Sequence, residues 1–260
     1  MMKDLFSLKG RTAIVTGGSR GIGKMIAQGF IEQGAKVYIT ARKAPACDQA
    51  AEELSKTGGT CISLPHDISN LDGINAFIAE YKTHEKSVDI LVNNAGAAWG
   101  APFDEFPEAG WDKVMNLNVK SPFFLTQGLH PLLKENATQQ TPSKIINIAS
   151  IDGIRMNPME TYSYQASKAG MIHLTRRMAA RLIQDNIAVS AIAPGAFASE
   201  MNKIAKEQSE MVGQAIPAKR IGKDSDMAGT AVFLASRAGD YIIGDTLAVD
   251  GGVAYCSNSI

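Results

Sequence analysis

The chain has 260 residues, and its 26 Lys plus Arg balance 26 Asp plus Glu, so the formal net charge is zero. Apolar residues make up 45% and charged residues 20%, which is typical of a globular protein and excludes a disordered chain or a strongly basic nucleic-acid binder. No apolar run approaches the roughly 18 residues of a membrane span. The first residues lack the apolar core of a secretory signal.

The cysteines and histidines bear on compartment and metal binding. The 3 cysteines form no close pair, and an odd number favours a reducing compartment over a disulfide framework. The 4 histidines show no paired ligand spacing. We therefore expect a cytoplasmic protein with no metal site, no membrane partner and no nucleic-acid partner.

Short β-branched runs alternate with helical stretches along the whole chain. This alternation is typical of a parallel sheet covered by helices on both faces, and right-handed crossovers make such a sheet doubly wound. The sequence predicts an α/β, Rossmann-like fold of about seven strands in a single domain over 1–260, with a lid-like segment at about 196–217. Strands are expected at 11–16, 35–40, 60–65, 89–92, 144–149, 187–193 and 245–249, and helices at 21–33, near 46–57, 70–82, 111–134, 161–185 and 224–235.

The segment TGGSRGIG, Thr16–Gly23, follows the first expected strand and opens the first helix. Gly17 permits a tight turn, Gly21 lets the backbone approach a pyrophosphate, and Gly23 allows close packing of helix on strand. A helix N-terminus offers free N–H groups and a partial positive charge. Glycine turns also occur for packing alone, but this one lies within a βαβ unit and therefore predicts a dinucleotide site.

The end of the second expected strand bears on the choice of dinucleotide. An acidic residue there would bind the adenosine ribose and select NAD, but the position is Ala41 and Arg42 follows it. Arg20 lies inside the glycine turn, and two arginines could make charge-assisted contacts with a 2′-phosphate. Both arginines could instead be solvated surface charges. We favour NADP over NAD.

Tyr164 and Lys168 are four residues apart on a predicted helix and therefore share one face. A tyrosine with a pKa near ~10 is a poor proton carrier at neutral pH, and a nearby lysine cation favours its phenolate. The alternative is an ordinary helix with a packed tyrosine and a snorkelling lysine. Tyr162 is the weaker candidate because Ala166, not a lysine, lies four residues on. Ser150 ends the fifth expected strand, where open α/β sheets place ligands.

These motifs together resemble the short-chain dehydrogenase/reductase family. The resemblance rests on the Gly-x3-Gly-x-Gly spacing, NNAG at Asn93–Gly96 and YQASK at Tyr164–Lys168, and it extends from Gly10 to about Gly252. It implies an oxidoreductase that moves the pro-S hydride between NADP(H) and a carbonyl or secondary alcohol.

The resemblance also implies the catalytic roles, with Asn118, Ser150, Tyr164 and Lys168 as the catalytic set. Ser150 would polarise the substrate carbonyl and Tyr164 would exchange the proton. Lys168 and a water at a helix kink near Asn118 would refill it, with Asn116 as the competing alignment. Ser150 and Tyr164 lie slightly farther apart than in the family pattern, so we expect a bulge within 151–160.

Further residues are expected to hold the cofactor by the same resemblance. Asp67 and Ile68 would contact the adenine, although Asp67 also lies at a helix start that Ser69 or Asn70 could cap. The predicted cofactor-binding set is Gly17, Ser19, Arg20, Gly21, Ile22, Gly23, Arg42, Asp67, Ile68, Asn94, Ala95, Gly96, Tyr164, Lys168, Pro194, Gly195, Phe197 and Ser199.

The substrate wall is expected from 97–102, 151–161 and 196–217. Methionines there would adapt to a flexible apolar ligand, although each side chain could equally pack the lid against the body. The pattern resembles the 3-oxoacyl reductase branch, including the β-ketoacyl reductases of rhamnolipid synthesis. The wall candidates are Trp99, Ile154, Met156, Pro158, Met159, Phe197 and Met201.

Two other functions remain open. One is a sugar-acid or polyol dehydrogenase, similar to gluconate 5-dehydrogenase, and the other is an NADP(H)-sensing protein without turnover. The family resemblance further implies a homodimer or homotetramer built on the helices near 111–134 and 161–185, with the 245–260 end in the other interface.

Overall fold

The computed structural model of the chain describes residues 4–200 and 202–256. Seven strands form one sheet in the order β3-β2-β1-β4-β5-β6-β7, and every neighbouring pair is parallel. This confirms the predicted doubly wound α/β fold. The strands are β1 (Thr12–Thr16), β2 (Lys36–Thr40), β3 (Thr60–Ser63), β4 (Ile90–Asn93), β5 (Ser143–Ile148), β6 (Ile187–Pro194) and β7 (Thr246–Val249).

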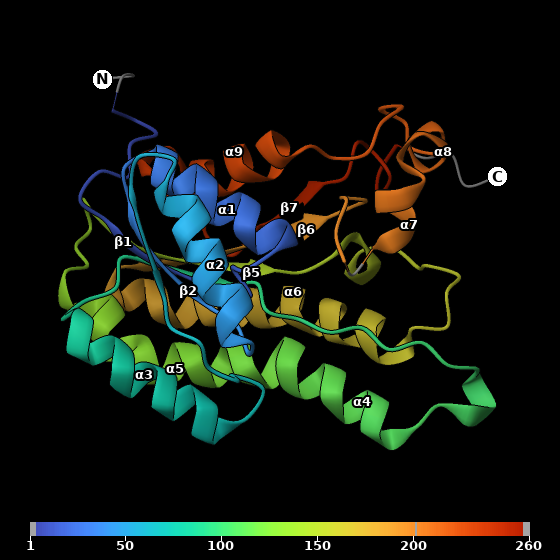
Figure 1. Cartoon of the computed structure of the whole chain (residues 1–260), viewed down its shortest axis with the longest axis horizontal. Helices are drawn as coiled ribbons and strands as arrows, with labels where there is room; N and C mark the ends of the chain where they lie inside the picture. The colour runs from blue at the N-terminus through green and yellow to red at the C-terminus, as the bar shows by residue number, and fades with distance from the viewer. Residues whose placement is uncertain (1–3, 201, 257–260) are drawn as a thin grey trace.

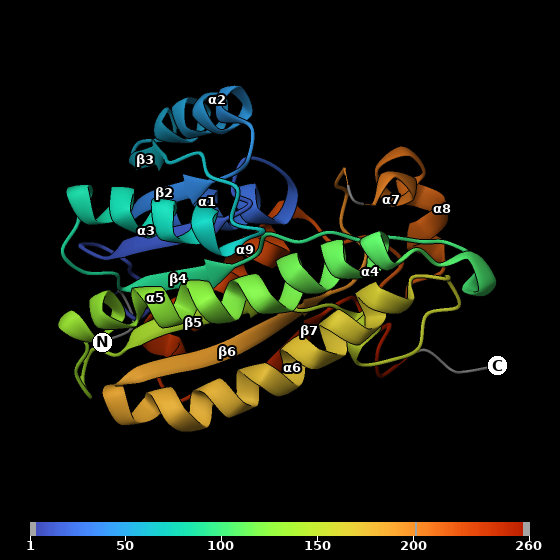
Figure 2. The same ribbon diagram turned by 90° about the horizontal axis from the view of Figure 1, so that it is seen from below.

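Helices cover both faces of the sheet (Figure 1). One face carries α1 (Gly21–Glu32), α2 (Ala44–Ser55) and α9 (Asp224–Ala235). The other carries α3 (Leu71–His84), α5 (Ser121–Glu135) and α6 (Tyr162–Leu182), with α4 (Glu108–Met115) packed against α6. Figure 2 shows this second layer from below.

The strand residues alternate between the two helical layers. Val15 on β1 and Val92 on β4 face the layer of α1, α2 and α9, whereas Ile14 and Leu91 beside them face the layer of α3, α5 and α6. All four are 0% exposed. Because both faces are buried, the strands read in the sequence as continuous apolar runs instead of alternating ones.

The long helix predicted over 111–134 is the main local departure. It begins earlier, at Glu108, and a π-helical turn over Asn116–Lys120 separates α4 from α5. π-turns of this kind are inserted into helices most often at functional sites. Apolar periodicity does not reveal them, because one extra residue per turn shifts the pattern only slightly.

The predicted lid region holds two short helices, α7 (Lys203–Glu207) and α8 (Ser209–Gln214). They stand beyond the carboxyl ends of the central strands in both views. Met201, one of the expected wall residues, lies outside the described residues. Among 4–200 and 202–256, no helix is long and apolar enough to cross a membrane.

Candidate active site

The glycine turn connects β1 to α1 through a backbone that only glycine fits easily. Gly17 has φ +64°, and its N–H donates to the Thr40 carbonyl over 2.8 Å. A Cβ on Gly23 would lie 2.4 Å from both the Gly17 carbonyl oxygen and Asn94 Nδ2, so a side chain there cannot be accommodated without a backbone shift. The turn therefore brings the helix N-terminus against the loop that follows β4.

Thr16 holds that loop in place. It was not among the residues predicted for the site. Its Oγ1 accepts the N–H groups of Asn94 and Ala95, each over 2.9 Å, and donates to the Val92 carbonyl. Asn94 Nδ2 in turn donates to the Thr16 carbonyl over 2.7 Å. A threonine at the last position of a buried strand was the available signal, because a hydroxyl buried there needs partners.

The N-terminus of α1 is suited to an anion. No side chain caps it, and its first turn contains no acidic residue. The first N–H groups of a helix lack internal partners and favour negative charge. Arg20 and Arg42 are exposed, and neither guanidinium forms an ion pair with the residues that the structure describes. Ser19 and Ile22 in the same turn are partly exposed.

The loop after β3 serves its helix as well as the predicted site. Asn70 caps α3, accepting the Gly73 N–H over 2.9 Å, whereas Asp67 Oδ1 accepts the Ser69 N–H over 3.0 Å. The Ile68 side chain is 5% exposed and packs in the core, so only its backbone remains for a ligand. The alternative of Asn70 as the cap is therefore confirmed.

The backbone after β6 is tightly packed. Gly195 donates its N–H to the Val249 carbonyl over 3.0 Å, and a Cβ on it would lie 2.7 Å from Asp250 Cβ. The Phe197 side chain is 2% exposed and packs on Gly222. Its ring packs in the core and also lines a cavity, so its place in the substrate wall stays a prediction. Pro194, which ends β6, is also buried.

Ser199 connects the start of the lid region to the glycine turn. A Cβ on Gly21 would lie 3.3 Å from Ser199 Cβ. Two segments almost 180 residues apart in sequence therefore meet at the α1 N-terminus, roughly where the resemblance places the phosphates.

Ser150, Tyr164 and Lys168 converge at the carboxyl end of β5. Lys168 is 5% exposed, its Nζ donates to the Ile148 carbonyl over 2.8 Å, and Nζ lies 5.6 Å from the centre of the Tyr164 ring. Gly96 joins this group to the cofactor loop, because a Cβ on it would lie 3.8 Å from Lys168 Nζ. The glycine turn, the NNAG loop and the Tyr–Lys pair thus form one continuous site.

The electrostatics of the pair differ from the simple expectation. Burial raises the pKa of Tyr164 to about 12, although the neighbouring Ser150 hydroxyl favours the phenolate. Burial also lowers the pKa of Lys168 to about 8, because its ammonium is removed from water. We expected Lys168, together with an oxidised nicotinamide, to lower the tyrosine pKa, whereas in this chain burial is the largest influence on that pKa and raises it.

Asn118 lies in the π-turn and its side chain is 3% exposed. Its Oδ1 accepts the Ala97 N–H over 2.8 Å, and its Nδ2 donates to the Ala97 carbonyl and to Ser167 Oγ over 2.9 and 3.0 Å. Ser167 Oγ then donates to the Tyr164 carbonyl over 2.7 Å. Asn118 therefore ties the NNAG loop to the helix of Tyr164, which favours it over Asn116 as the residue of interest.

The loop between Ser150 and Tyr164 contains a 3-10 turn, η3 (Ile151–Gly153), which takes up its extra length. Ser150 Oγ accepts the Asp152 N–H over 3.1 Å. Farther along, the Gln165 side chain donates to the carbonyls of Asn157 and Met159 over 3.1 and 3.0 Å. These bonds fix the loop to the first turn of α6, beside Tyr164.

Of the remaining predicted wall residues, the methionines face outward. Met156 and Met159 are 81% and 58% exposed, whereas Ile154 packs in a small core cluster with Ala149. Trp99 stacks over Gly110, where a Cβ would lie 2.7 Å from its ring, and Lys113 Nζ is 5.1 Å from the ring centre. Both described methionines of the predicted wall are thus exposed, whereas Ile154 and Trp99 pack against neighbouring residues.

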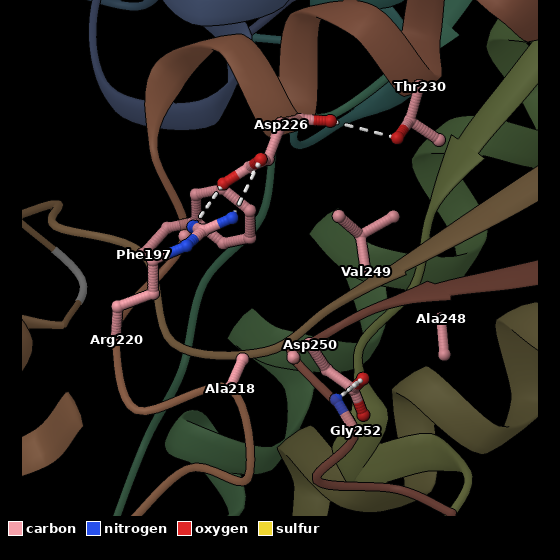
Figure 3. A pocket seen from close by; sticks show the side chains of 11 residues that line it. Phe197, Ala218, Arg220, Asp226, Thr230, Ala248, Val249, Asp250 and Gly252 are labelled. Carbon is pink, nitrogen blue, oxygen red and sulfur yellow. Dashed lines mark hydrogen bonds and ion pairs between the residues drawn. The ribbon is translucent and has the colours of Figure 1, made fainter. Parts of the chain in front are cut away.

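Two cavities lie outside the Tyr–Lys site. One of about 330 Å³ is lined by Phe197, Ala218, Arg220, Gly222, Asp226, Thr230 and 248–252 (Figure 3). Within it, Arg220 pairs with the Asp226 carboxylate, which also accepts the Lys223 N–H at the start of α9. The charged side chains that line this cavity therefore cap the start of α9, and we assign them no catalytic role.

The second cavity, of about 360 Å³, is aromatic and lies between the starts of α4 and α6. Tyr162 lines it, packs edge-on against Phe103 and Phe106, and donates its hydroxyl to Glu160 over 3.1 Å. The weaker tyrosine candidate therefore has a structural role. Across the described residues, no group of three or more His, Cys, Asp or Glu could hold a metal.

Comparison with known proteins places this site in a family. A family model described as enoyl-(acyl carrier protein) reductase matches residues 17–254. The chain is 44% identical to the rhamnolipids biosynthesis 3-oxoacyl-(acyl-carrier-protein) reductase of Pseudomonas aeruginosa, over 96% of this chain and 99% of that protein. It is 39% identical to 2-dehydro-3-deoxy-D-gluconate 5-dehydrogenase of Escherichia coli, over 97% and 98% of the two chains.

The fold comparison agrees with the sequence comparison. The Pseudomonas aeruginosa RhlG/NADP active-site complex matches with a TM-score of 0.93 and 44% identity, over 97% of this chain and 100% of that one. The chain therefore belongs to the short-chain dehydrogenase/reductase family and is an oxidoreductase. Among its relatives, similarity is strong both to a 3-oxoacyl reductase and to a sugar-acid dehydrogenase.

Proposed function

We propose that the protein is an NADP(H)-dependent reductase of 3-oxoacyl thioesters. The observation that carries the proposal is the continuous site. The loop at Asn94–Gly96 contacts Lys168 of the Tyr164–Lys168 pair at one end and the glycine turn before the uncapped α1 at the other. The similarity to a 3-oxoacyl reductase over nearly the whole chain supports the substrate class. Three free cysteines agree with a reducing, cytoplasmic location.

The residues present fit NADP(H). The α1 N-terminus and the crowded glycines would hold the pyrophosphate, because the backbone there is open to close approach and favours negative charge. Arg20 and Arg42 would bind the 2′-phosphate, with no acidic residue at position 41 to repel it. Asp67, Asn94 and the backbone after β6 would hold the adenine, ribose and nicotinamide ends.

The reduced nicotinamide supplies the hydride in this scheme. Ser150 holds the substrate carbonyl and polarises it, and Tyr164 donates a proton to the oxygen as negative charge develops there. The high pKa of Tyr164 keeps that proton available at neutral pH. The Lys168 ammonium, and a water that would bind at the π-turn of Asn118, then return a proton to the tyrosine.

A second candidate is reduction of a keto sugar acid. It is favoured by the similarity to 2-dehydro-3-deoxy-D-gluconate 5-dehydrogenase and by exposed Arg155 in the loop beside the site. Arg155 Nη1 donates to the Val253 carbonyl over 2.9 Å, so that guanidinium also holds the C-terminal segment. The exposed apolar residues of the wall favour the thioester instead.

A steady-state panel distinguishes the candidates. NADPH consumption is measured with 3-oxoacyl thioesters of increasing chain length, with 5-ketogluconate and with simple diketones, and NADH serves as the parallel control. We expect kcat/KM to rise with acyl length. A preference for the keto sugar would contradict the thioester assignment and leave the catalytic roles intact. Tight NADPH binding without turnover would instead support a sensing protein.

We also propose that the protein assembles as a homodimer or homotetramer through α4, α5 and α6. Phe103, Trp111 and Phe123 on these helices and the turn before them are 73%, 41% and 39% exposed. Phe103 and Trp111 line one aromatic cavity together, and exposed apolar clusters are typical of contact surfaces. Sedimentation should give a mass at least twice that of the 27.7 kDa chain, and a monomer would contradict the assembly.

A further inference from the structure

Asp152 is an ionisable residue of the site that neither the motifs nor the proposed mechanism uses. It lies on η3, two residues after Ser150, and its N–H donates to Ser150 Oγ over 3.1 Å. The same turn packs directly on α6, because a Cβ on Gly153 would lie 2.6 Å from the Lys168 carbonyl carbon. The turn that carries Asp152 thus lies against Ser150 on one side and against the main chain of Lys168 on the other.

The loop holds this carboxyl in position. Asn157 Nδ2 donates to Asp152 Oδ1 over 3.1 Å, and the Asn157 carbonyl accepts Gln165 Nε2 over 3.1 Å. Gln165 directly follows Tyr164 on α6. The carboxyl is therefore part of a hydrogen-bonded clamp between the substrate loop and the catalytic helix.

The charged surroundings of Asp152 are few. From its own loop it faces Arg155, and from α6 it acts on Tyr164 and Lys168. Besides α6, the strand β6 packs against η3, and β6 carries no ionisable side chain. Among the described residues, Asp152 is the acidic group that acts on both Tyr164 and the buried Lys168.

We propose that Asp152 is a positioning residue whose fixed carboxylate retains the proton on the Tyr164–Lys168 pair and so sets the pH range of proton donation. The proposal rests on the catalytic roles given above. A carboxylate beside the pair stabilises the lysine ammonium and disfavours the tyrosine phenolate, so its charge favours the protonated form of both groups. Asn157 stabilises the carboxylate against the burial that raises its pKa.

The sign follows for each group. Lys168 has a pKa of about 8, lowered by burial and raised by Asp152, so loss of the carboxylate moves its titration to lower pH. Tyr164 has a pKa that burial and Asp152 both raise, so its titration moves to lower pH as well. The alkaline limb of carbonyl reduction must then shift down, whichever of the two groups governs it.

The first test measures Lys168 without relying on turnover. The full chain is labelled with 13C-lysine, and the ε-carbon signal of Lys168, assigned by its absence in Lys168→Met, is followed through a pH titration. In Asp152→Asn we expect the midpoint to fall by about half to one pH unit, as for loss of one nearby charge. Asp152→Ser removes the carboxylate and also shortens the side chain, and its titration midpoint should fall by the same amount.

Matched variants separate charge from shape. Asp152→Glu retains the carboxylate and should keep the midpoint near that of the unchanged protein. Glu135→Gln removes an exposed carboxylate at the end of α5, far from the site, and should have no effect. Unchanged midpoints in Asp152→Asn and Asp152→Ser would overturn the proposal.

The second test is the pH profile of kcat/KM for acetoacetyl-coenzyme A reduction. One pH unit above the unchanged protein's midpoint, Asp152→Asn should be about three- to ninefold slower. The two profiles should converge at lower pH, where the Tyr164–Lys168 pair is fully protonated in both proteins. If Lys168→Met leaves the profile unchanged, the proposed catalytic role fails. If Lys168→Met alters it but Asp152→Asn does not, only the role of Asp152 fails.

Discussion

The proposed cofactor half and the proposed substrate half of this site are built by different means. Around the glycine turn, the backbone itself shapes the site: Gly17 and Gly23 leave no room for side chains, and Thr16 binds main-chain groups. Around the loop after Ser150, the hydrogen bonds of the Asn157 and Gln165 side chains fix the shape of the site. Backbone geometry serves a ligand common to a whole family, whereas side-chain contacts can change with the substrate.

The largest expected effect lies where the two halves meet. Tyr164→Phe removes the proposed proton donor but keeps the ring, so kcat should fall by about 10²- to 10⁴-fold, the usual contribution of general acid catalysis. NADPH affinity, measured by fluorescence titration, should change little. Tyr162→Phe is the matched control, because that hydroxyl bonds Glu160 away from the pair. Full turnover in Tyr164→Phe would reject the mechanism.

The next effect tests the backbone-built half. Gly23→Ala places a methyl group 2.4 Å from the Gly17 carbonyl oxygen, which forces the turn apart at a cost of about 1–3 kcal/mol. NADPH should then bind about ten- to a hundredfold more weakly by calorimetry. Gly229→Ala on α9, where a Cβ meets nothing within 4 Å, is the control and should bind normally. Normal binding by Gly23→Ala would show that the turn does not hold the cofactor.

Cofactor choice should depend on a charge at the edge of the same half. Arg42→Asp replaces a cation near the expected 2′-phosphate with an anion, so NADPH affinity should fall about tenfold or more, as for loss of a charge-assisted hydrogen bond. Affinity for NADH, which lacks that phosphate, should change little. Unchanged NADPH affinity would contradict the assignment of NADP.

The smallest effect tests the half built by side chains. Gln165→Ala removes the bonds to the Asn157 and Met159 carbonyls, each of which contributes about 0.5–1.5 kcal/mol. The KM for the carbonyl substrate should rise severalfold, while NADPH affinity stays the same. Steady-state kinetics and cofactor titration on one preparation provide the check. A matching loss of NADPH affinity would show that the two halves are not separable.

The same contrast explains what the sequence predicted well. All seven strands, the glycine turn and the positions of Ser150, Tyr164 and Lys168 followed from apolar runs and local spacing, which act within a few residues. Doubly buried strands and a Gly-x3-Gly-x-Gly turn leave clear traces of this kind. The cofactor half was therefore the more predictable one.

The remaining features depend on contacts distant in sequence. The helix kink near Asn118 was expected only from the family resemblance, and the π-turn found there places the Asn118 side chain in bonds to Ala97 and Ser167, 21 and 49 residues away. The burial of Phe197 against Gly222 and the raised pKa of Tyr164 depend on how whole segments pack. Neither short-range periodicity nor residue type carries that information.

The most direct test of the account follows the hydride itself. The protein is mixed with acetoacetyl-coenzyme A and NADPH deuterated at the pro-S position of the nicotinamide, and the alcohol is analysed by mass spectrometry. The account predicts deuterium in the alcohol product and none from the pro-R label, with formation of product greatly slowed in Tyr164→Phe. Transfer of the pro-R label, or labelled product formed at an undiminished rate by Tyr164→Phe, would contradict it.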